Sequence, residues 1–257
     1  MQKVGILGGG QLGRMLLQQA ANYPVETFVM ESDGECPAAH LCHHFVQGDI
    51  RNFDDVYQFG KDLDAITIEI ESVNTDALEK LEAEGKRVYP KPAALRIIQN
   101  KILQKEFYQE QEIPTSEFVV VKNRKELRNN TRFIPAVQKM AQGGYDGRGV
   151  LMISSESEIE RAFDAPSVLE KKVAIRKEVS VIIGINESGH TAAFPSVEMI
   201  FDPVYNLLDF QICPPDLLEH IRWRAEAIAL KVVRKLQSPG IFAVELFVDD
   251  RGVVLVN

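Results

Sequence analysis

Apolar positions in the first hundred residues alternate between short continuous runs and helical spacing. Runs at 4–7, 25–30 and 65–70 predict strands, and a shorter run at 87–89 predicts a fourth. Between them, apolar residues three and four positions apart predict helices, one of which begins at Asn74, a residue type favoured at helix N-caps. This βαβ rhythm predicts an α/β fold with a parallel sheet and helices on both of its faces.

After a helical segment at 101–111 the pattern becomes rich in strands. Apolar runs predict strands at 118–121, 134–140, 150–153, 168–172, 179–185, 192–194, 207–212, 241–248 and 253–256. A long amphipathic helix is expected at 216–236. The sequence ends at Asn257, inside an expected strand, so we expect the chain to be part of a longer protein.

Composition excludes several classes of protein. The formal net charge of −8 and the pI near 5.3 disfavour a general nucleic-acid binder, which needs a basic face. No apolar run has the length of a membrane span, so no membrane partner is expected. The three cysteines lack CxxC spacing and are expected to be free thiols in a reducing compartment, which predicts a cytoplasmic protein.

Cysteine and histidine residues gather in one short segment, which raises the question of a zinc site. The residues are Cys36, His40, Cys42, His43 and His44. Their spacing matches no standard zinc finger. A turn followed by a short strand is the favoured interpretation.

The first glycine motif, GGGQLG at 8–13, follows a strand and precedes a helix. Bare backbone N–H groups at a helix N-terminus bind anions, so a phosphate-bearing ligand is expected there. Glu31 ends the second strand, where a dinucleotide-binding enzyme keeps its ribose carboxylate. An NAD(P)-dependent oxidoreductase and a tight turn without ligand are therefore both open alternatives.

The second glycine motif, GGYDGRG at 143–149, is more informative. Four glycines in seven residues allow close approach of N–H groups to phosphates. Lys139, on the preceding strand, supplies a point charge, and Arg148 supplies a bidentate donor. A Walker P-loop is absent from the sequence. The alternative is a glycine-rich hairpin tip, which needs fewer glycines than this.

Carboxylates and lysines elsewhere fit a nucleotide site. Glu170, with the two lysines after it, ends a strand whose backbone can bind adenine, and Glu178 can take the ribose hydroxyls. Glu245 is an isolated carboxylate within an apolar strand. A buried charge is costly unless it is paired or metal-bound, so Mg²⁺ is its expected partner; the alternative is an outward-facing strand residue.

Five segments in this order resemble the 5-(carboxyamino)imidazole ribonucleotide synthetase family of ATP-grasp enzymes. They are GGGQLGRM at 8–15, Lys139 with GGYDGRG, VLEKK at 168–172, FPSVE at 194–198, and AVELF with VLVN at 243–257. The resemblance covers the whole chain. It implies a Rossmann-like parallel sheet at 1–99, a small ATP-grasp subdomain with a glycine-rich lid at 100–172, and an incomplete large subdomain at 173–257, with mixed or antiparallel sheets.

The resemblance also implies a reaction. In this family ATP and bicarbonate give carboxyphosphate, which carboxylates 5-aminoimidazole ribonucleotide in purine biosynthesis. ATP and Mg²⁺ are the implied cofactors, and a cytoplasmic homodimer is the implied assembly. Carboxyphosphate hydrolyses readily, so a closing lid that excludes water suits the chemistry.

Matching the family motifs residue by residue assigns the expected site. The ATP-binding positions are Lys101, Lys139, Gly144, Tyr145, Asp146, Gly147, Arg148, Gly149, Val150, Glu170, Lys171, Lys172, Val173, Glu178 and Asn257. The positions expected to act in catalysis are Lys139, Asp146 and Arg148. The positions expected to bind the ribonucleotide are Gly10, Gln11, Leu12, Glu69, Glu71 and Tyr145. Glu245 matches a Mg²⁺ ligand.

The chain departs from the family at three places. Lys101 stands where arginine is usual, and the segment around Phe201 lacks the usual histidine. The family continues beyond residue 257, so this chain is expected to bind ATP weakly and to turn over little, in contrast to a version longer by about a hundred residues. Another ATP-grasp ligase acting through an acyl phosphate and a non-catalytic nucleotide-binding fragment remain alternatives.

Overall fold

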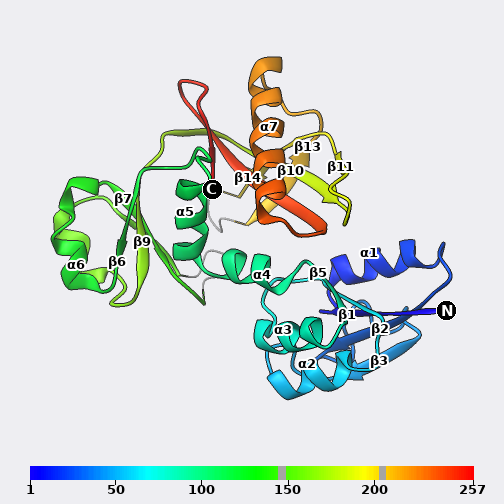
Figure 1. Ribbon diagram of the computed structural model, residues 1–257. Coiled ribbons are helices and arrows are strands. Elements are labelled where there is room, and N and C mark those ends of the chain that lie inside the picture. Colours follow the sequence, from blue (N-terminus) through cyan, green and yellow to red (C-terminus); the bar gives the residue numbers. More distant parts are fainter. Residues whose placement is uncertain (144–148, 203–206) are drawn as a thin grey trace. The chain divides into compact units, whose positions relative to one another are not determined.

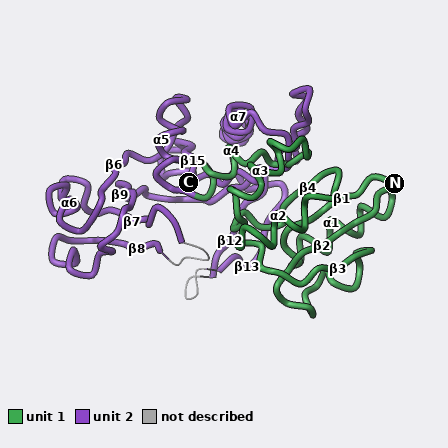
Figure 2. Tube along the Cα trace, turned by 60° about the horizontal axis from the view of Figure 1, so that its bottom comes forward, with its two compact units in different colours: residues 1–99 green, residues 100–257 purple. Residues whose placement is uncertain are grey.

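The computed structural model describes residues 1–143, 149–202 and 207–257. It divides into two compact units, residues 1–99 and 100–257, which are coloured separately in Figure 2. Each unit has its own sheets and its own hydrophobic core, so each is described by itself.

Unit 1 is built on a five-stranded parallel sheet with the order β3-β2-β1-β4-β5 (Figure 1). Its strands are β1 (Gln2–Leu7), β2 (Val25–Glu31), β3 (His44–Gln47), β4 (Ala65–Ile68) and β5 (Arg87–Tyr89). Leu7 pairs with Met30 on one side and with Ile68 on the other. The carboxyl ends of β1, β2 and β4 therefore meet at one edge, and the parallel sheet predicted from the sequence is confirmed.

Helices cover both faces of this sheet, as predicted. On one face α1 (Gln11–Ala20) contributes Leu17 to a small core with Ile6 and Val29. On the other face α2 (Phe53–Gly60) and α3 (Thr75–Ala83) form a larger core that contains Phe59 and Leu78. The Asn74 side chain accepts a hydrogen bond from Ala77 N at 2.9 Å, which confirms the N-cap of α3.

One helix of unit 1 was not predicted from the sequence. Helix α4 (Pro92–Gln99) begins at the second of two prolines, Pro90 and Pro92, which the sequence pattern indicated only as the end of β5. Proline is tolerated at the first helical position because the N–H that it lacks has no partner within the helix. Pro92 occupies that position here, and Leu95 of α4 is completely buried.

Unit 2 begins with helix α5 (Lys101–Glu110), whose N-cap Asn100 accepts hydrogen bonds from Ile102 N and Leu103 N. An antiparallel sheet follows with the order β6-β9-β7-β8. Its strands are β6 (Phe118–Val121), β7 (Ala136–Met140), β8 (Val150–Ile153) and β9 (Ser167–Lys171). Short helices α6 (Arg124–Arg128), η1 (Thr131–Phe133) and η2 (Glu156–Arg161) close a core around Leu169.

The second sheet of unit 2 is also antiparallel, with the order β13-β12-β10-β14-β15 and β11 paired to β10. Its strands are β10 (Ile175–Ile185), β11 (Thr191–Ala193), β12 (Val197–Phe201), β13 (Leu208–Ile212), β14 (Gly240–Asp249) and β15 (Val254–Val256). Helix α7 (Glu219–Leu236) begins three residues later than expected and packs on β10 and β14 (Figure 1). Its buried residues are Ile221, Ala225, Ile228, Ala229, Val232 and Val233. The antiparallel sheets expected after the parallel one are therefore present.

Strand β12 was missed because Glu198 interrupts its apolar run. The Glu198 side chain is buried and forms an ion pair with Lys177 at 2.7 Å, so the charge is compensated inside the fold. A sequence pattern does not reveal such a pairing between distant residues, so no strand was expected at 197–201.

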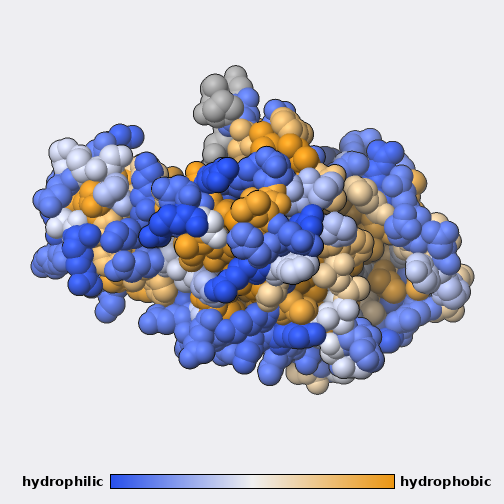
Figure 3. All heavy atoms as spheres, turned by 90° about the horizontal axis from the view of Figure 1, so that it is seen from above, coloured by the Kyte–Doolittle hydropathy of each residue, from blue (hydrophilic) through white to orange (hydrophobic). Residues whose placement is uncertain are grey.

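The surface is mixed in character. Figure 3 shows one face of the molecule, on which hydrophilic residues predominate and smaller hydrophobic areas lie between them. Single large apolar side chains are exposed, such as Trp223 on α7 and Ile241 on β14. Within the described ranges, no helix has both the length and the apolar character that crossing a membrane requires.

Candidate nucleotide site and glycine turn

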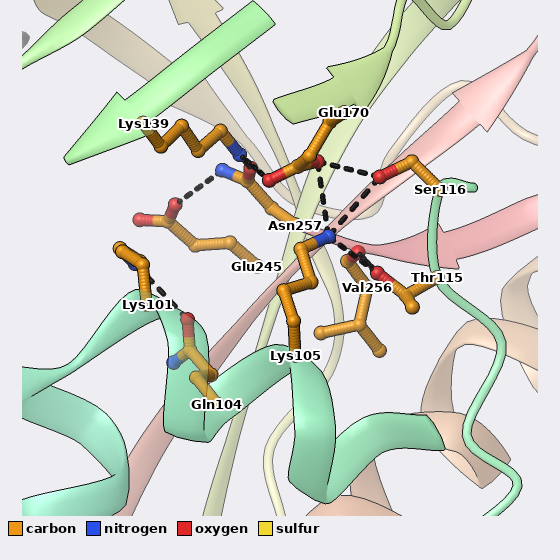
Figure 4. A network of polar contacts seen from close by, with 10 residues as sticks. All are labelled: Lys101, Gln104, Lys105, Thr115, Ser116, Lys139, Glu170, Glu245, Val256 and Asn257. Atoms are coloured by element: carbon orange, nitrogen blue, oxygen red, sulfur yellow. Dashed lines mark hydrogen bonds and ion pairs between the residues drawn. The ribbon is translucent and has the colours of Figure 1, made fainter. Parts of the chain in front are cut away.

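A buried carboxylate between two lysines forms the centre of the candidate site in unit 2. Glu170, near the end of β9, is only 3% exposed. Lys105 Nζ on α5 lies 2.9 Å from Glu170 Oε2, and Lys139 Nζ on β7 lies 3.0 Å from Glu170 Oε1 (Figure 4). Two positive charges and one negative charge leave this cluster with a net charge of +1.

Lys105 is held entirely by protein groups. It is 1% exposed, and its three N–H donors are matched by Glu170, by Thr115 Oγ1 at 2.6 Å and by Ser116 Oγ at 3.1 Å. The Ser116 hydroxyl in turn donates to Glu170 Oε2, and the Thr115 hydroxyl donates to Val256 O at 2.9 Å. Lys105 therefore ties α5 to β9 and β15.

The charges in this cluster shift one another's pKa values. Burial alone would raise the pKa of Glu170, but Lys139, Lys105 and the Ser116 hydroxyl outweigh it and hold the pKa at about 2. Burial lowers the pKa of Lys105 to about 8 in spite of the attraction of Glu170. Near pH 7 both groups are therefore charged.

Lys139 also reaches toward β14 and β15. Its Nζ donates to Asn257 Oδ1 at 2.7 Å, and Asn257 Nδ2 donates to Glu245 Oε2 at 3.3 Å (Figure 4). Glu245 lies on the exposed face of β14, between the buried residues Val244 and Leu246. Glu245 is therefore an outward-facing strand residue that also belongs to the polar network of Lys139 and Asn257.

A second carboxylate shares the face of Glu245. Glu178 on β10 stands opposite Phe247, and Ser180 stands opposite Glu245, so the two glutamates lie diagonally on one face of the sheet. Burial and the charge of Glu245 raise the pKa of Glu178, and Lys139 partly opposes the shift. A cation bound near this face would relieve the repulsion.

Three other expected ATP-binding residues, Lys101, Lys171 and Lys172, have hydrogen bonds within the protein. Lys101 N donates to Ala141 O at 2.9 Å, which joins the start of α5 to the end of β7, and Lys101 Nζ contacts Gln104. The backbone N–H groups of Lys171 and Lys172 already donate to Glu117 O and Pro135 O. Those two N–H groups are thus occupied within the protein.

The glycine-rich segment is described only at its ends. Met140 N donates to Gly149 O at 2.8 Å, and Val150 opens β8 opposite Lys139. Gly143 and Gly149 have positive φ values of 77° and 76°, which disfavour any residue with a side chain. Residues Gly144, Tyr145, Asp146, Gly147 and Arg148 lie outside the described ranges, so their expected roles remain predictions.

These residues fit a polyanionic nucleotide. Glu170 Oε1 is buried, and the Lys139 ammonium at 3.0 Å compensates its charge. The net positive cluster and the ends of a glycine hairpin lie beside it.

Glu178 and Glu245 are the carboxylates of this region that could bind Mg²⁺. No group of three His, Cys, Asp or Glu side chains converges anywhere in the part of the chain that the structure describes. Mg²⁺ is usually held by one or two carboxylates together with waters and substrate phosphates, so the pair Glu178 and Glu245 has a suitable donor set.

In unit 1 the first glycine motif forms the turn from β1 into α1. Gly8 has a φ of 103°, and a Cβ atom at Gly8 or Gly10 would lie 2.7 Å from a carboxylate oxygen of Glu69. Glycine therefore lets the Glu69 side chain lie against the turn. The N-cap of α1 is Gly10, with no side-chain cap and no acidic residue in the first turn. This helix N-terminus is chemically suited to an anion.

Glu31 is engaged by the turn itself. Its Oε2 accepts a hydrogen bond from Gly9 N at 3.2 Å, and its Oε1 accepts from Ser32 N and Ser32 Oγ. The ribose hydroxyls of a dinucleotide would have to displace these bonds, which disfavours the oxidoreductase alternative. Gln11 and Leu12 are exposed at the start of α1, and Glu71 is exposed after β4.

The cysteine and histidine segment forms a turn that leads into strand β3, as favoured from the sequence. Cys36 is buried in the core beneath α1. His43 Nδ1 lies 2.8 Å from Thr27 Oγ1, and His44 Nε2 lies 2.7 Å from Glu26 Oε1. These histidines thus have separate protein partners.

Lys105, Thr115 and Ser116 are not among the site residues expected from the sequence. A signal for Lys105 was present, because it lies three residues before the buried Tyr108 and so on the same side of α5. A lysine at an apolar helical position was the clue that a buried carboxylate partner existed elsewhere in the chain.

Comparisons with known proteins give matches to both units. Residues 1–99 match the ribonucleotide synthetase preATP-grasp domain, and residues 106–257 match the ATP-grasp domain. The chloroplastic phosphoribosylaminoimidazole carboxylase of Vigna aconitifolia is 33% identical over 99% of this chain and 46% of its own length. The N5-carboxyaminoimidazole ribonucleotide synthase of Brucella melitensis is 32% identical over 99% of this chain and 72% of its own length.

A solved structure is also similar. The N5-carboxyaminoimidazole synthase of Aspergillus clavatus, in complex with ADP and 5-aminoimidazole ribonucleotide, superposes with a TM-score of 0.90. It is 30% identical, and the match covers 100% of this chain and 68% of that one. The chain spans about half the length of the plant and yeast carboxylases that it matches.

Proposed function

The chain belongs to the N5-carboxyaminoimidazole ribonucleotide synthetase family of ATP-grasp proteins, and from this we propose that it serves the ATP-dependent carboxylation of 5-aminoimidazole ribonucleotide in purine biosynthesis. The single observation that carries the proposal is the Lys105–Glu170–Lys139 cluster, because a net positive charge beside a glycine hairpin suits nucleotide phosphates.

Unit 2 is the proposed nucleotide site. Lys139 and Lys101 would contact the phosphates, Glu178 the ribose, and the strand end at 170–173 the adenine. Arg148, Asp146 and Tyr145, together with the glycines around them, are proposed from the sequence to close over the phosphates. Closure excludes water, which protects a reactive carboxyphosphate, and the cationic groups stabilise the charge that develops during phosphoryl transfer.

Glu245 is the proposed Mg²⁺ ligand, with Glu178 beside it on the same face. Mg²⁺ supplies neutralisation of the phosphate oxygens. Asn257, which is hydrogen-bonded to both Lys139 and Glu245, would orient the cationic and the anionic group relative to each other.

Unit 1 is the proposed ribonucleotide site. The first turn of α1, with Gly10, Gln11 and Leu12, would take the phosphate, because its N–H groups lack a side-chain cap. Glu69 and Glu71 would face the aminoimidazole. The chain is further proposed to comprise functional parts 1–99, 100–172 and 173–257, to work in the cytoplasm, and to use bicarbonate as its one-carbon substrate within a homodimer.

Two measurements test this proposal. Isothermal titration calorimetry of the chain with ATP and Mg²⁺ should detect binding, and Lys139→Met should weaken it at least about tenfold because a charge-assisted contact is lost. ATP turnover is then followed with bicarbonate, with and without 5-aminoimidazole ribonucleotide. Dependence on both supports the carboxylation, whereas binding of NAD(P) in place of ATP would overturn the proposal.

Another ATP-grasp ligase that acts through an acyl phosphate is the second candidate. The cluster around Glu170 and the position of Glu245 suit any such ligase. Turnover that requires ATP and a carboxylate other than bicarbonate, with no response to the aminoimidazole ribonucleotide, would favour it.

A further inference from the structure

We propose that Lys105 is a positioning residue that neutralises Glu170 and so leaves the charge of Lys139 for the phosphates of the nucleotide. The inference rests on the proposed ATP site and adds a function for a residue that cannot itself touch the ligand. Lys105 lies at the buried end of the cluster, while Lys139 lies at its more accessible end (Figure 4).

The two lysines differ in how many of their donors are available to a ligand. Lys105 uses all three of its donors on Glu170, Thr115 and Ser116, so none remains for a ligand. Lys139 is 13% exposed, and its contacts, with Glu170 Oε1 and Asn257 Oδ1, lie toward the face that carries Glu245. Only Lys139 is placed to exchange a protein contact for a phosphate oxygen.

The charge balance shows why Lys105 matters. With both lysines the cluster carries +1; without Lys105, Glu170 and Lys139 form a closed pair with no net charge. Glu170 would then have Lys139 as its one charged partner in the cluster, in an interior where an opposite charge at 3.0 Å attracts strongly. A phosphate would have to separate that pair before it could bind.

Other charged groups act on the same cluster. The charges of Lys139 and Lys101 lower the pKa of Lys105, whereas the charge of Glu170 raises it. Tyr108, buried on α5, has a raised pKa because of its burial and the charges of Glu170 and Glu245, so it stays neutral. Glu170 is therefore the carboxylate that Lys105 must balance.

Three forms of the chain set the net charge of the cluster. The wild type has +1, Lys105→Met has 0, and the double variant Lys105→Met with Glu170→Gln returns to +1. ATP and adenosine binding are each measured by calorimetry, and the ratio of the two dissociation constants is compared. Adenosine lacks phosphates, so it reports any general damage to the nucleotide pocket.

We expect Lys105→Met to weaken ATP binding about ten- to hundredfold while adenosine binding stays unchanged, and the double variant to restore the wild-type ratio. Lys125→Met, an exposed lysine on α6, is the matched control and should change neither. If Lys105→Met does not fold, the double variant, in which the charges of Lys105 and Glu170 are both removed, should still show the wild-type ratio.

The inference would be overturned if Lys105→Met weakened the binding of ATP and of adenosine equally. It would also be overturned if the ratio of the two dissociation constants did not follow the net charge of the cluster among the folded variants. A wild-type chain that binds ATP with the same affinity as Lys105→Met overturns this inference alone. A wild-type chain that binds no ATP overturns the proposed function as well.

Discussion

Lys139 and Asn257 meet at 2.7 Å although 118 residues separate them in the sequence. The contact joins β7 of the first antiparallel sheet in unit 2 to the end of β15 in the second. Asn257 also donates to Glu245 Oε2, so one amide links the proposed phosphate-binding lysine to the proposed metal ligand. Two sheets thus hold one polar network.

Asn257→Ala should weaken ATP binding about fivefold, because Lys139 and Glu245 lose the amide that orients them. Calorimetry with ATP and Mg²⁺ measures the change. Asn22→Ala removes an exposed amide that bonds Gln19 O in unit 1, and it should leave the affinity as it is. Equal effects of the two substitutions would contradict the orienting role of Asn257.

Glu170 should make stability depend on pH in the acid range. Its pKa in the folded chain is about 2, below the ordinary value of 4.5. The unfolded chain therefore takes up the proton first as the pH falls, so the stabilisation is complete above pH 4.5 and is lost as the pH falls toward 2. The loss is on the order of 3 kcal/mol at most.

Urea unfolding at several pH values tests this. The difference in unfolding free energy between the wild type and Glu170→Gln should narrow as the pH falls below 4.5. Glu110→Gln, an exposed glutamate on α5, should show no such narrowing. A constant difference for Glu170→Gln down to pH 3 would show that its lysine partners do not shift its titration.

The glycine turn of unit 1 should tolerate no side chain at Gly8. Gly8→Ala is expected to destabilise the chain by about 1–3 kcal/mol, because the φ of 103° is strained for alanine and the new Cβ would meet the Glu69 carboxylate at 2.7 Å. Thermal unfolding followed by circular dichroism measures it. Gly34→Ala is the matched control, since a Cβ there meets nothing within 4 Å. If both variants melt together, Gly8 is not constrained by the turn.

The sequence was most informative where local pattern decides structure. Apolar runs located β1, β2 and β4, and the helical spacing of α7 agrees with the residues that it buries. Asn74 predicted the start of α3, because an N-cap side chain accepts a hydrogen bond from an N–H group only a few residues away. The first glycine motif located the β1–α1 turn for the same local reason.

Long-range pairing of charges was hidden from the sequence. No site role was expected for Lys105 and no strand at 197–201, because the glutamate that pairs with Lys105 and the lysine that pairs with Glu198 lie elsewhere in the chain. The Ser116 hydroxyl reaches Glu170 across 54 residues. Local patterns report which residues are apolar, but the partner of a buried charge is set by how the sheets and α5 pack.

Glu245 should control how Mg²⁺ affects nucleotide binding. In the wild type, adding Mg²⁺ should tighten ATP binding, since the cation neutralises both the phosphates and the two glutamates on one face of β10 and β14. Glu245→Gln should remove most of that gain while changing the affinity for metal-free ATP little or strengthening it, because a negative charge near the phosphates is lost. The measurement is calorimetry of ATP with Mg²⁺ and with EDTA.

The same comparison distinguishes metal binding from simple repulsion by Glu245. Glu110→Gln again serves as control and should keep the full Mg²⁺ effect. If Glu245→Gln strengthens ATP binding equally with and without Mg²⁺, Glu245 acts only through its charge and does not bind the cation. If Mg²⁺ tightens ATP binding equally in Glu245→Gln and the wild type, the metal is held elsewhere, and the exposed position of Glu245 on β14 is then that of an ordinary outward-facing strand residue.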